Sequence, residues 1–197
     1  AEVLSQFPMV THVVNVQGDE PLIDPQMIDF LATNMIEQTG LKVATLIRRI
    51  EDAADLSNPN VVKVVINRNN EAMYFSRQAI PFVRDFPVDS WLEHGVYYKH
   101  VGMYAYTSQA LMAIEKLHMH PYEALEKLEQ LTWIAHGLSI ECYETNMESI
   151  GIDTEEDLKA NDRALDSMKE VFDKMTPEEW EKEIKFLSHI VVPEKLL

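Results

Sequence analysis

Several features that are common in secreted, membrane-bound and nucleotide-binding proteins are scarce in this sequence. Cys142 is the one cysteine among 197 residues, so no disulfide can form within the chain, which fits a reducing compartment. Six glycines are present, and they form neither a G-x-G-x-x-G pattern nor a P-loop. No apolar run approaches the ~18 residues of a membrane span, and residues 1–7 lack the basic and apolar regions of a signal peptide. We therefore expect a cytoplasmic protein.

Basic residues are also few. The chain holds 17 Lys and Arg against 33 Asp and Glu, a net charge of −16, which argues against nucleic acid or an anionic membrane as a partner. The imbalance is uneven, because residues 141–197 carry 16 acidic and 7 basic side chains while residues 42–100 carry 7 and 8. Anionic ligands are therefore expected to bind within the 42–100 stretch.

Hydrophobic periodicity predicts strands that alternate with helices. Strands are expected at 10–16, 43–47, 61–67, 72–76, 97–106 and 139–144, and helices at about 25–39, 108–118, 122–136 and 154–172. This alternation is typical of the α/β class. We expect a mixed, largely parallel sheet flanked by helices, with an antiparallel portion in the middle of the chain.

Two aspartates stand where a short apolar run gives way to a loop or helix. Asp19 follows the run at 10–16, and Asp153 precedes a helix whose cap can be supplied by Thr154. Carboxylate oxygens at such positions suit Mg²⁺, which proteins hold through one or two carboxylates together with substrate phosphates. Turn formation by Asp19 and helix capping by Asp153 explain the same residues without a metal, so the positions alone leave both interpretations open.

Polar residues in the middle of the chain form a second candidate group. His100 and Tyr104 lie four apart on an expected strand, so their side chains share one face of the sheet. Arg77 ends another strand, and Glu129 and Gln130 lie between leucines on a helix. Each residue taken alone is better explained by a surface salt bridge or by a hydrogen bond at the edge of the core than by a binding role.

Six stretches together resemble the 3-deoxy-manno-octulosonate (Kdo) cytidylyltransferase family, the CMP-Kdo synthetases. They are VVNVQGDEPLIDP (13–25), NPNVVKVV (58–65), YFSRQAIP (74–81), YYKHVGMYAY (97–106), EKLEQL (126–131) and ESIGIDTEEDL (148–158). They occur in the family's order with compatible spacing, and the resemblance covers residues 10 to about 163. It implies a fold like that of nucleotide-diphospho-sugar transferases.

The resemblance implies an activity and roles for the candidate residues. Members of the family transfer CMP from CTP to the 2-hydroxyl of Kdo, release pyrophosphate and supply lipopolysaccharide synthesis. By resemblance, Asp19 and Asp153 would be the catalytic aspartates that hold Mg²⁺, and Gln17 and Gly18 would lie near the nucleotide. The sugar acid would contact Arg77, His100, Tyr104, Glu129 and Gln130, and a homodimer would form through residues 58–106.

The chain departs from the family pattern at both ends. The family's first βα unit, with its basic phosphate-binding loop, has no counterpart, so we expect a cytidylyltransferase domain at 1–163 that lacks this unit and is inactive by itself. Residues 164–197 are expected to form an acidic helical extension. Two alternatives stay open: a cytidylyltransferase for a related acidic sugar, such as 8-amino-Kdo or a nonulosonate, and an inactive fragment that retains only dimerisation.

Overall fold

A computed structural model describes residues 2–16, 23–147 and 176 of the chain. In chain order the elements are α1 (Glu2–Ser5), β1 (His12–Asn15), α2 (Pro25–Glu37), β2 (Val43–Arg49), α3 (Ala53–Ser57), β3 (Lys63–Ile66), β4 (Ala72–Ser76), η1 (Val88–Ser90), α4 (Trp91–His94), β5 (Tyr98–Thr107), α5 (Ser108–Ile114), α6 (Pro121–Glu126), α7 (Gln130–Ala135) and β6 (Glu141–Glu144). The element η1 is a single 3₁₀ turn that leads into α4.

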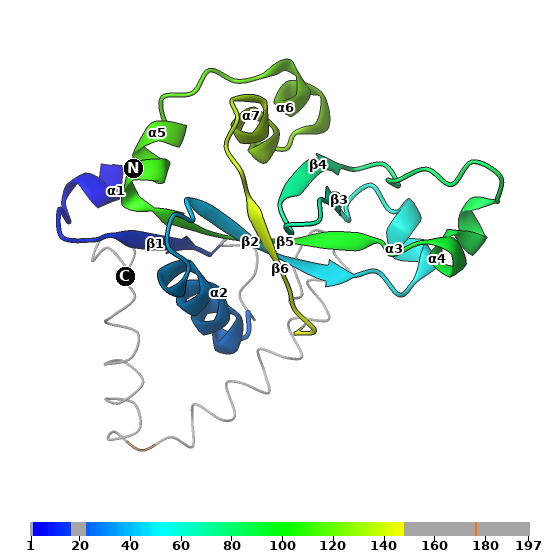
Figure 1. Ribbon diagram of the computed structural model, residues 1–197, viewed down its shortest axis with the longest axis horizontal. Helices are drawn as coiled ribbons and strands as arrows, with labels where there is room; N and C mark the ends of the chain where they lie inside the picture. The colour runs from blue at the N-terminus through cyan, green and yellow to red at the C-terminus, as the bar shows by residue number, and fades with distance from the viewer. Residues whose placement is uncertain (1, 17–22, 148–175, 177–197) are drawn as a thin grey trace.

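The six strands form one sheet, and β5 is its organising strand (Figure 1). The order is β4-β3-β5-β2-β6, and β1 also pairs with β5. Strand β5 runs antiparallel to β1, β2 and β3, and β3 runs antiparallel to β4. Among the described residues, only β2 and β6 pair in parallel.

The mixed sheet flanked by helices is confirmed, but the expectation that it is largely parallel is wrong for the described residues. Strands β1 and β2, which α2 connects, run in the same direction, as a crossover connection requires. They do not pair with each other, because β5 lies between them and is antiparallel to both. The alternation of strands and helices therefore correctly predicted that β1 and β2 run in the same direction. Hydrophobic periodicity cannot show that a third strand, β5, lies between them.

Helix α2 covers one face of the sheet with an apolar stripe. Met27, Leu31 and Met35 recur at four-residue spacing, are almost fully buried, and pack against a cluster that contains Leu46 and Met103. The helix begins as predicted, because Asp24 Oδ1 accepts a hydrogen bond of 2.9 Å from the Gln26 amide and proline follows at the first helical position.

The opposite face of the sheet is covered by α5, α6 and α7, which lie above it in Figure 1. The core on this face is more aromatic, with Phe75, Tyr104, Tyr106 and Trp133 among its buried members. A smaller third cluster, built on Trp91 and Tyr97, packs beneath α3 and α4 at the end of the sheet that carries the β3–β4 hairpin. The face under α6 and α7 is the one that receives the candidate site residues.

The helices after β5 differ from the prediction. The helix expected at 108–118 ends at Ile114, and the helix expected at 122–136 is two helices, α6 and α7. The break falls at Lys127, which adopts a left-handed conformation with φ of 56°. Residues with a Cβ rarely adopt this conformation, so the sequence of this stretch does not predict a turn at Lys127.

Four short elements, α1, α3, η1 and α4, were not predicted, because each is shorter than the window in which periodicity is visible. The six predicted strands are all present, and β4 matches its predicted bounds. The helix expected at 154–172, and the division into 1–163 and 164–197, lie outside the described residues apart from residue 176.

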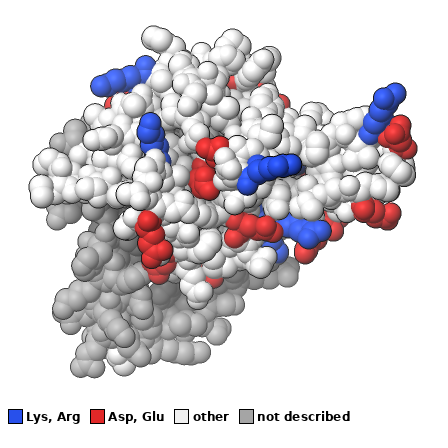
Figure 2. Space-filling view, in the orientation of Figure 1, with Lys and Arg blue, Asp and Glu red and all other residues white. Residues whose placement is uncertain are grey.

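Charged side chains of both signs are interspersed over the described part of the face shown in Figure 2. None of the described helices is long and apolar enough to cross a membrane. Cys142 is buried on β6, and burial and then the Glu141 charge raise the pKa of its thiol to about 12. A thiol in this environment is a small core side chain rather than a nucleophile.

Candidate active site

Strand β5 changes its partner half-way along one edge. Its first residues pair with β3 and its last four with β1. On the other edge the register with β2 shifts at the same place, because Leu46 pairs with Val101 while Thr45 pairs with Tyr104. Two residues of β5 therefore have no partner on β2, and His100 and Tyr104 stand on either side of the interruption. An insertion of two residues preserves the alternation of faces, so both side chains still point toward the α6 and α7 side.

The interruption is held together by a buried threonine. Thr45 is fully buried, and its hydroxyl donates a hydrogen bond of 2.7 Å to the carbonyl of Met103. The same oxygen lies 2.9 Å from His100 Nε2. Because the single hydroxyl proton is directed to Met103, the imidazole must donate from Nε2, which leaves Nδ1 as an acceptor. Burial lowers the pKa of His100 to about 3, so the ring is neutral at pH 7.

Tyr104 carries a buried hydroxyl that no described residue satisfies. The residue is 1% exposed, and its phenolic oxygen has no hydrogen-bond partner. Its ring packs between His100, at 5.1 Å between centroids, and Trp133, at 5.0 Å. Burial raises the pKa of the phenol well above its ordinary value, so the group keeps its proton. An unsatisfied buried hydroxyl costs about 1–3 kcal/mol, and such groups in a native structure call for an explanation such as a ligand.

Glu129 and Gln130 lie at the start of α7, next to the tyrosines. The Glu129 charge contributes, after burial, to raising the pKa of both Tyr104 and Tyr106, so the carboxylate lies near both phenols. Partial burial and the charge of Glu123 raise the pKa of Glu129 itself. Gln130 is 3% exposed. The structure thus brings His100, Tyr104 and Glu129 to one region, and Gln130 is buried at the start of the helix that follows Glu129.

Arg77 is held from two sides by main-chain carbonyls. Its Nε donates to the Glu126 carbonyl at 2.8 Å, and Nη1 donates to the Pro59 carbonyl at 3.0 Å. These bonds use two of the five N–H donors of the guanidinium and fix its plane. The other donors suit a carboxylate, which a planar guanidinium binds through parallel hydrogen bonds.

The connection between α6 and α7 joins these groups. Glu126 ends α6 and contacts Arg77, while Glu129 precedes α7 and lies near the tyrosines. Because Lys127 turns the chain between them, one short connection reaches both the end of β4 and the middle of β5. Five of the nine predicted site residues therefore lie around a single structural feature.

The other four predicted residues, Gln17, Gly18, Asp19 and Asp153, lie outside the described residues. Strand β1 leads toward the first three and ends at Asn15, which pairs with Tyr104. In the part of the chain that the structure describes, no three His, Cys, Asp or Glu side chains are grouped to hold a metal ion.

Four residues that support this region were not singled out from the sequence: Thr45, Lys63, Glu126 and Trp133. Only Lys63 carried a visible signal, because a lysine in the middle of the apolar run VVKVV cannot reach solvent easily from a central strand. Thr45, Glu126 and Trp133 are common residue types in strands and helices, and their roles depend on register and on the break at Lys127.

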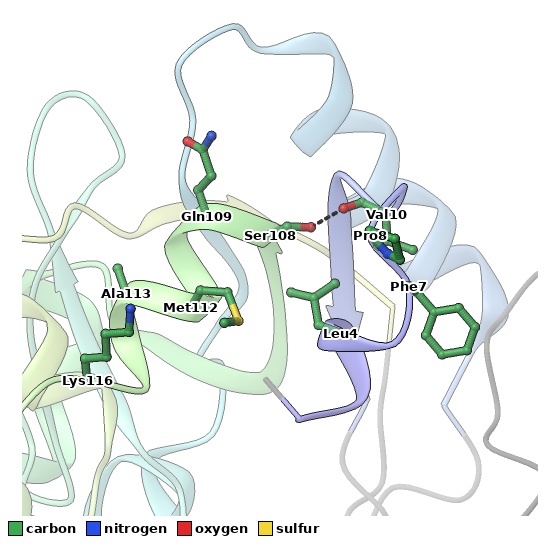
Figure 3. A pocket seen from close by; sticks show the side chains of 9 residues that line it. All are labelled: Leu4, Phe7, Pro8, Val10, Ser108, Gln109, Met112, Ala113 and Lys116. Carbon is green, nitrogen blue, oxygen red and sulfur yellow. Dashed lines mark hydrogen bonds between the residues drawn. The ribbon is translucent and has the colours of Figure 1, made fainter.

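A groove of about 630 Å³ lies elsewhere, between α5 and the segment that joins α1 to β1 (Figure 3). It is lined by Leu4, Phe7, Pro8, Val10, Ser108, Gln109, Met112, Ala113 and Lys116. Ser108 Oγ closes one side by donating to the carbonyl of Val10. None of the predicted site residues lines this groove.

Comparison with known proteins agrees with the architecture. The family model described as cytidylyltransferase matches residues 1–141. This chain belongs to the cytidylyltransferase family. The resemblance inferred from the sequence is confirmed by this family model together with the relatives and the solved structure that follow.

Curated relatives of this chain carry the name 3-deoxy-manno-octulosonate cytidylyltransferase. The protein of Cytophaga hutchinsonii is 47% identical over 147 residues, which cover 74% of this chain and 58% of the relative. That of Psychromonas ingrahamii is 46% identical over 167 residues, 81% of this chain and 66% of the relative. The chain therefore spans less than two thirds of the length of these relatives.

A solved structure is also similar. A CMP:2-keto-3-deoxy-manno-octonic acid synthetase, solved in complex with CTP, superposes with a TM-score of 0.74 at 36% sequence identity. The match covers 85% of this chain and 66% of the other. The described fold is therefore that of a nucleotidyltransferase.

The low pKa of His100 gives a testable expectation. The unfolded chain takes up a proton at this histidine below pH 6.5, whereas the folded protein does not until about pH 3, so His100 makes the free energy of unfolding fall as the pH drops through that window. We expect the His100 ring resonances in a ¹H–¹³C NMR titration to stay unchanged from pH 7.5 to 5. The His100→Gln variant identifies the peak by its loss. A midpoint near 6.5 would show that the ring is solvated.

Proposed function

We propose that this protein transfers CMP from CTP to the 2-hydroxyl of Kdo, with release of pyrophosphate, and so supplies an activated sugar acid for lipopolysaccharide synthesis. Two kinds of similarity support this reaction: the names of the relatives and the CTP-bound state of the similar structure. The observation in this chain that carries the proposal is the Tyr104 hydroxyl, which is buried, protonated and without a protein partner among the described residues. We further propose that the enzyme acts in the cytoplasm.

The side chains around Tyr104 have the chemistry that a polyhydroxy acid requires. Tyr104 can donate a hydrogen bond to a sugar oxygen, and Nδ1 of the neutral His100 can accept one from a hydroxyl. Glu129 adds acceptors and Gln130 adds both donors and acceptors. Arg77, whose plane is already fixed, would bind the carboxylate. These groups would orient the 2-hydroxyl for attack and exclude water, which is how an enzyme of this kind gains most of its rate.

The metal in this proposal is Mg²⁺, held by Asp19 and Asp153. Carboxylate oxygens are its preferred protein ligands, and when bound it offsets the negative charge that develops on the phosphates. Strands β1 and β6, which precede the two aspartates in the chain, run in the same direction, so both lead toward the same end of the sheet. Gln17 and Gly18 would contact the nucleotide from the connection that follows β1.

A homodimer is the proposed assembly, formed through residues 58–106. Exposed apolar side chains of this stretch favour a homodimer. Monomeric proteins rarely expose large apolar surfaces, and such surfaces usually mark an interface with a partner. The exposed side chains are Met73 at 59% exposure, Phe82 at 72%, Phe86 at 48% and Val96 at 49%.

An inert fragment that only dimerises is less well supported than an enzyme. Dimerisation does not explain why the buried Tyr104 hydroxyl has no hydrogen-bond partner among the described residues.

The direct test is pyrophosphate release with CTP and Mg²⁺ by the purified protein, expressed from its complete reading frame. We expect turnover with Kdo, and loss of it when EDTA removes the metal and return when Mg²⁺ is added in excess. Parallel assays with 8-amino-Kdo and with N-acetylneuraminate separate the related sugar acids. Faster turnover with either of these than with Kdo would reassign the substrate, and no release with any of the three would refute the proposed reaction.

Arg77→Lys tests the assignment of the carboxylate site. A lysine places a single point charge where the guanidinium offers parallel donors, and charge-assisted bonds of this kind contribute about 1.5–3 kcal/mol. We expect the KM for Kdo to rise roughly 10- to 100-fold while the KM for CTP changes by less than about threefold. Steady-state kinetics with each substrate varied in turn measures the split. An equal loss for both substrates would move Arg77 toward the phosphates.

A further inference from the structure

Lys63 is a fully buried lysine in the middle of the sheet. Its exposure is 0%, and its ammonium donates to two main-chain carbonyls, that of Asn58 at 2.8 Å and that of Arg77 at 2.6 Å. Burial lowers its pKa, and the nearby Glu126 charge acts in the opposite direction. A buried ammonium is costly compared with an apolar side chain of similar size. Packing alone therefore does not account for a lysine at this position.

The two carbonyls that Lys63 binds belong to the segments that hold Arg77. One is the carbonyl of Arg77 itself, which follows β4. The other belongs to Asn58, the neighbour of Pro59, whose carbonyl accepts from Arg77 Nη1. The ammonium thus joins the strand end that carries the arginine to the loop that orients its guanidinium.

Glu126 completes the arrangement from the helical side. Its Oε2 accepts from the Arg77 amide at 2.9 Å, and its Oε1 accepts from the Ser76 hydroxyl at 2.7 Å. The Arg77 main chain is therefore held at its N–H by a carboxylate and at its C=O by an ammonium. Its side chain is held at the same time by the carbonyls of Glu126 and Pro59.

We propose that Lys63 is a positioning residue for Arg77: it sets the orientation in which the guanidinium meets the carboxylate of the acidic substrate. The inference rests on the proposed function, because it assumes that Arg77 binds that carboxylate. Lys63 itself does not touch the substrate. Its contribution is to join the two backbone segments on which the direction of the guanidinium depends, and a displacement of about 1 Å in such a group can cost roughly 100-fold in rate.

The test compares Lys63→Met with Lys99→Met. Methionine keeps the unbranched apolar stem of lysine and removes the charge. Lys99 pairs with Lys63 across the sheet, is bound to Asp55 at 2.7 Å, and has no bond to Arg77, so its variant removes the same charge from the same layer of the sheet. We expect Lys63→Met to raise the KM for Kdo roughly tenfold with the KM for CTP little changed, and Lys99→Met to leave both within about twofold.

A double-mutant cycle with Arg77→Ala separates positioning from stability. If Lys63 acts through Arg77, Lys63→Met has no further effect on the KM for Kdo once the arginine is absent. A general structural role would instead lower the melting temperature and kcat, leave the KM for Kdo unchanged in the single variant, and refute the inference. Additive effects in the double variant would also refute it. If the unmodified protein showed no turnover with Kdo, the proposed function would be refuted independently of the role of Lys63. The double-mutant cycle would then be measured through the melting temperatures of the four proteins.

Discussion

The hydrogen bond from the Thr45 hydroxyl to the Met103 carbonyl is the interaction on which the site depends. It stabilises the two-residue interruption between β5 and β2, at the level where β5 passes from β3 to β1. Because that hydroxyl has one proton, its direction also sets which nitrogen of His100 carries hydrogen. Strand pairing, the tautomer of a site histidine and the position of Tyr104 are therefore coupled through one buried side chain.

The two faces of the sheet differ in the polarity of the side chains that they bury. The face under α2 is filled mainly by methionine, leucine and alanine, and Tyr143, which packs against it, has a hydroxyl that also lacks a described partner. The other face buries a phenol and an imidazole beneath α7, and the sheet encloses the ammonium of Lys63 nearby. Each of these groups costs free energy unless it is hydrogen-bonded. His100 and Lys63 are bonded to protein, whereas Tyr104 has no described partner. Because Tyr104 also lies beside His100 and Glu129, we expect the ligand there rather than at the half-buried Tyr143.

Strands were well predicted because runs of β-branched residues are a local signal, as in the Val–Val–Ile run of β3. The prediction that His100 and Tyr104 point to the same face of the sheet is also correct. It holds because the interruption in β5 contains two residues, which preserves the alternation of faces, rather than one. The break at Lys127 could not be predicted, since a left-handed lysine depends on tertiary contacts. The binding of Arg77 by Glu126 follows from that break and was hidden for the same reason.

In the proposed site, the Tyr104 hydroxyl is reserved for a ligand. The most direct measurement is a comparison of Tyr104→Phe with the unmodified protein, by urea denaturation without ligand and by calorimetric titration with Kdo in the presence of CTP and EDTA, which prevents turnover. Removal of an unsatisfied buried hydroxyl should leave the free energy of unfolding unchanged or raise it by about 1 kcal/mol. The affinity for Kdo should fall roughly 10- to 100-fold, because a sugar oxygen buried without its partner costs about 1–3 kcal/mol. A variant that is less stable by more than about 1 kcal/mol but binds Kdo normally would show that the hydroxyl serves the fold, and would contradict the claim.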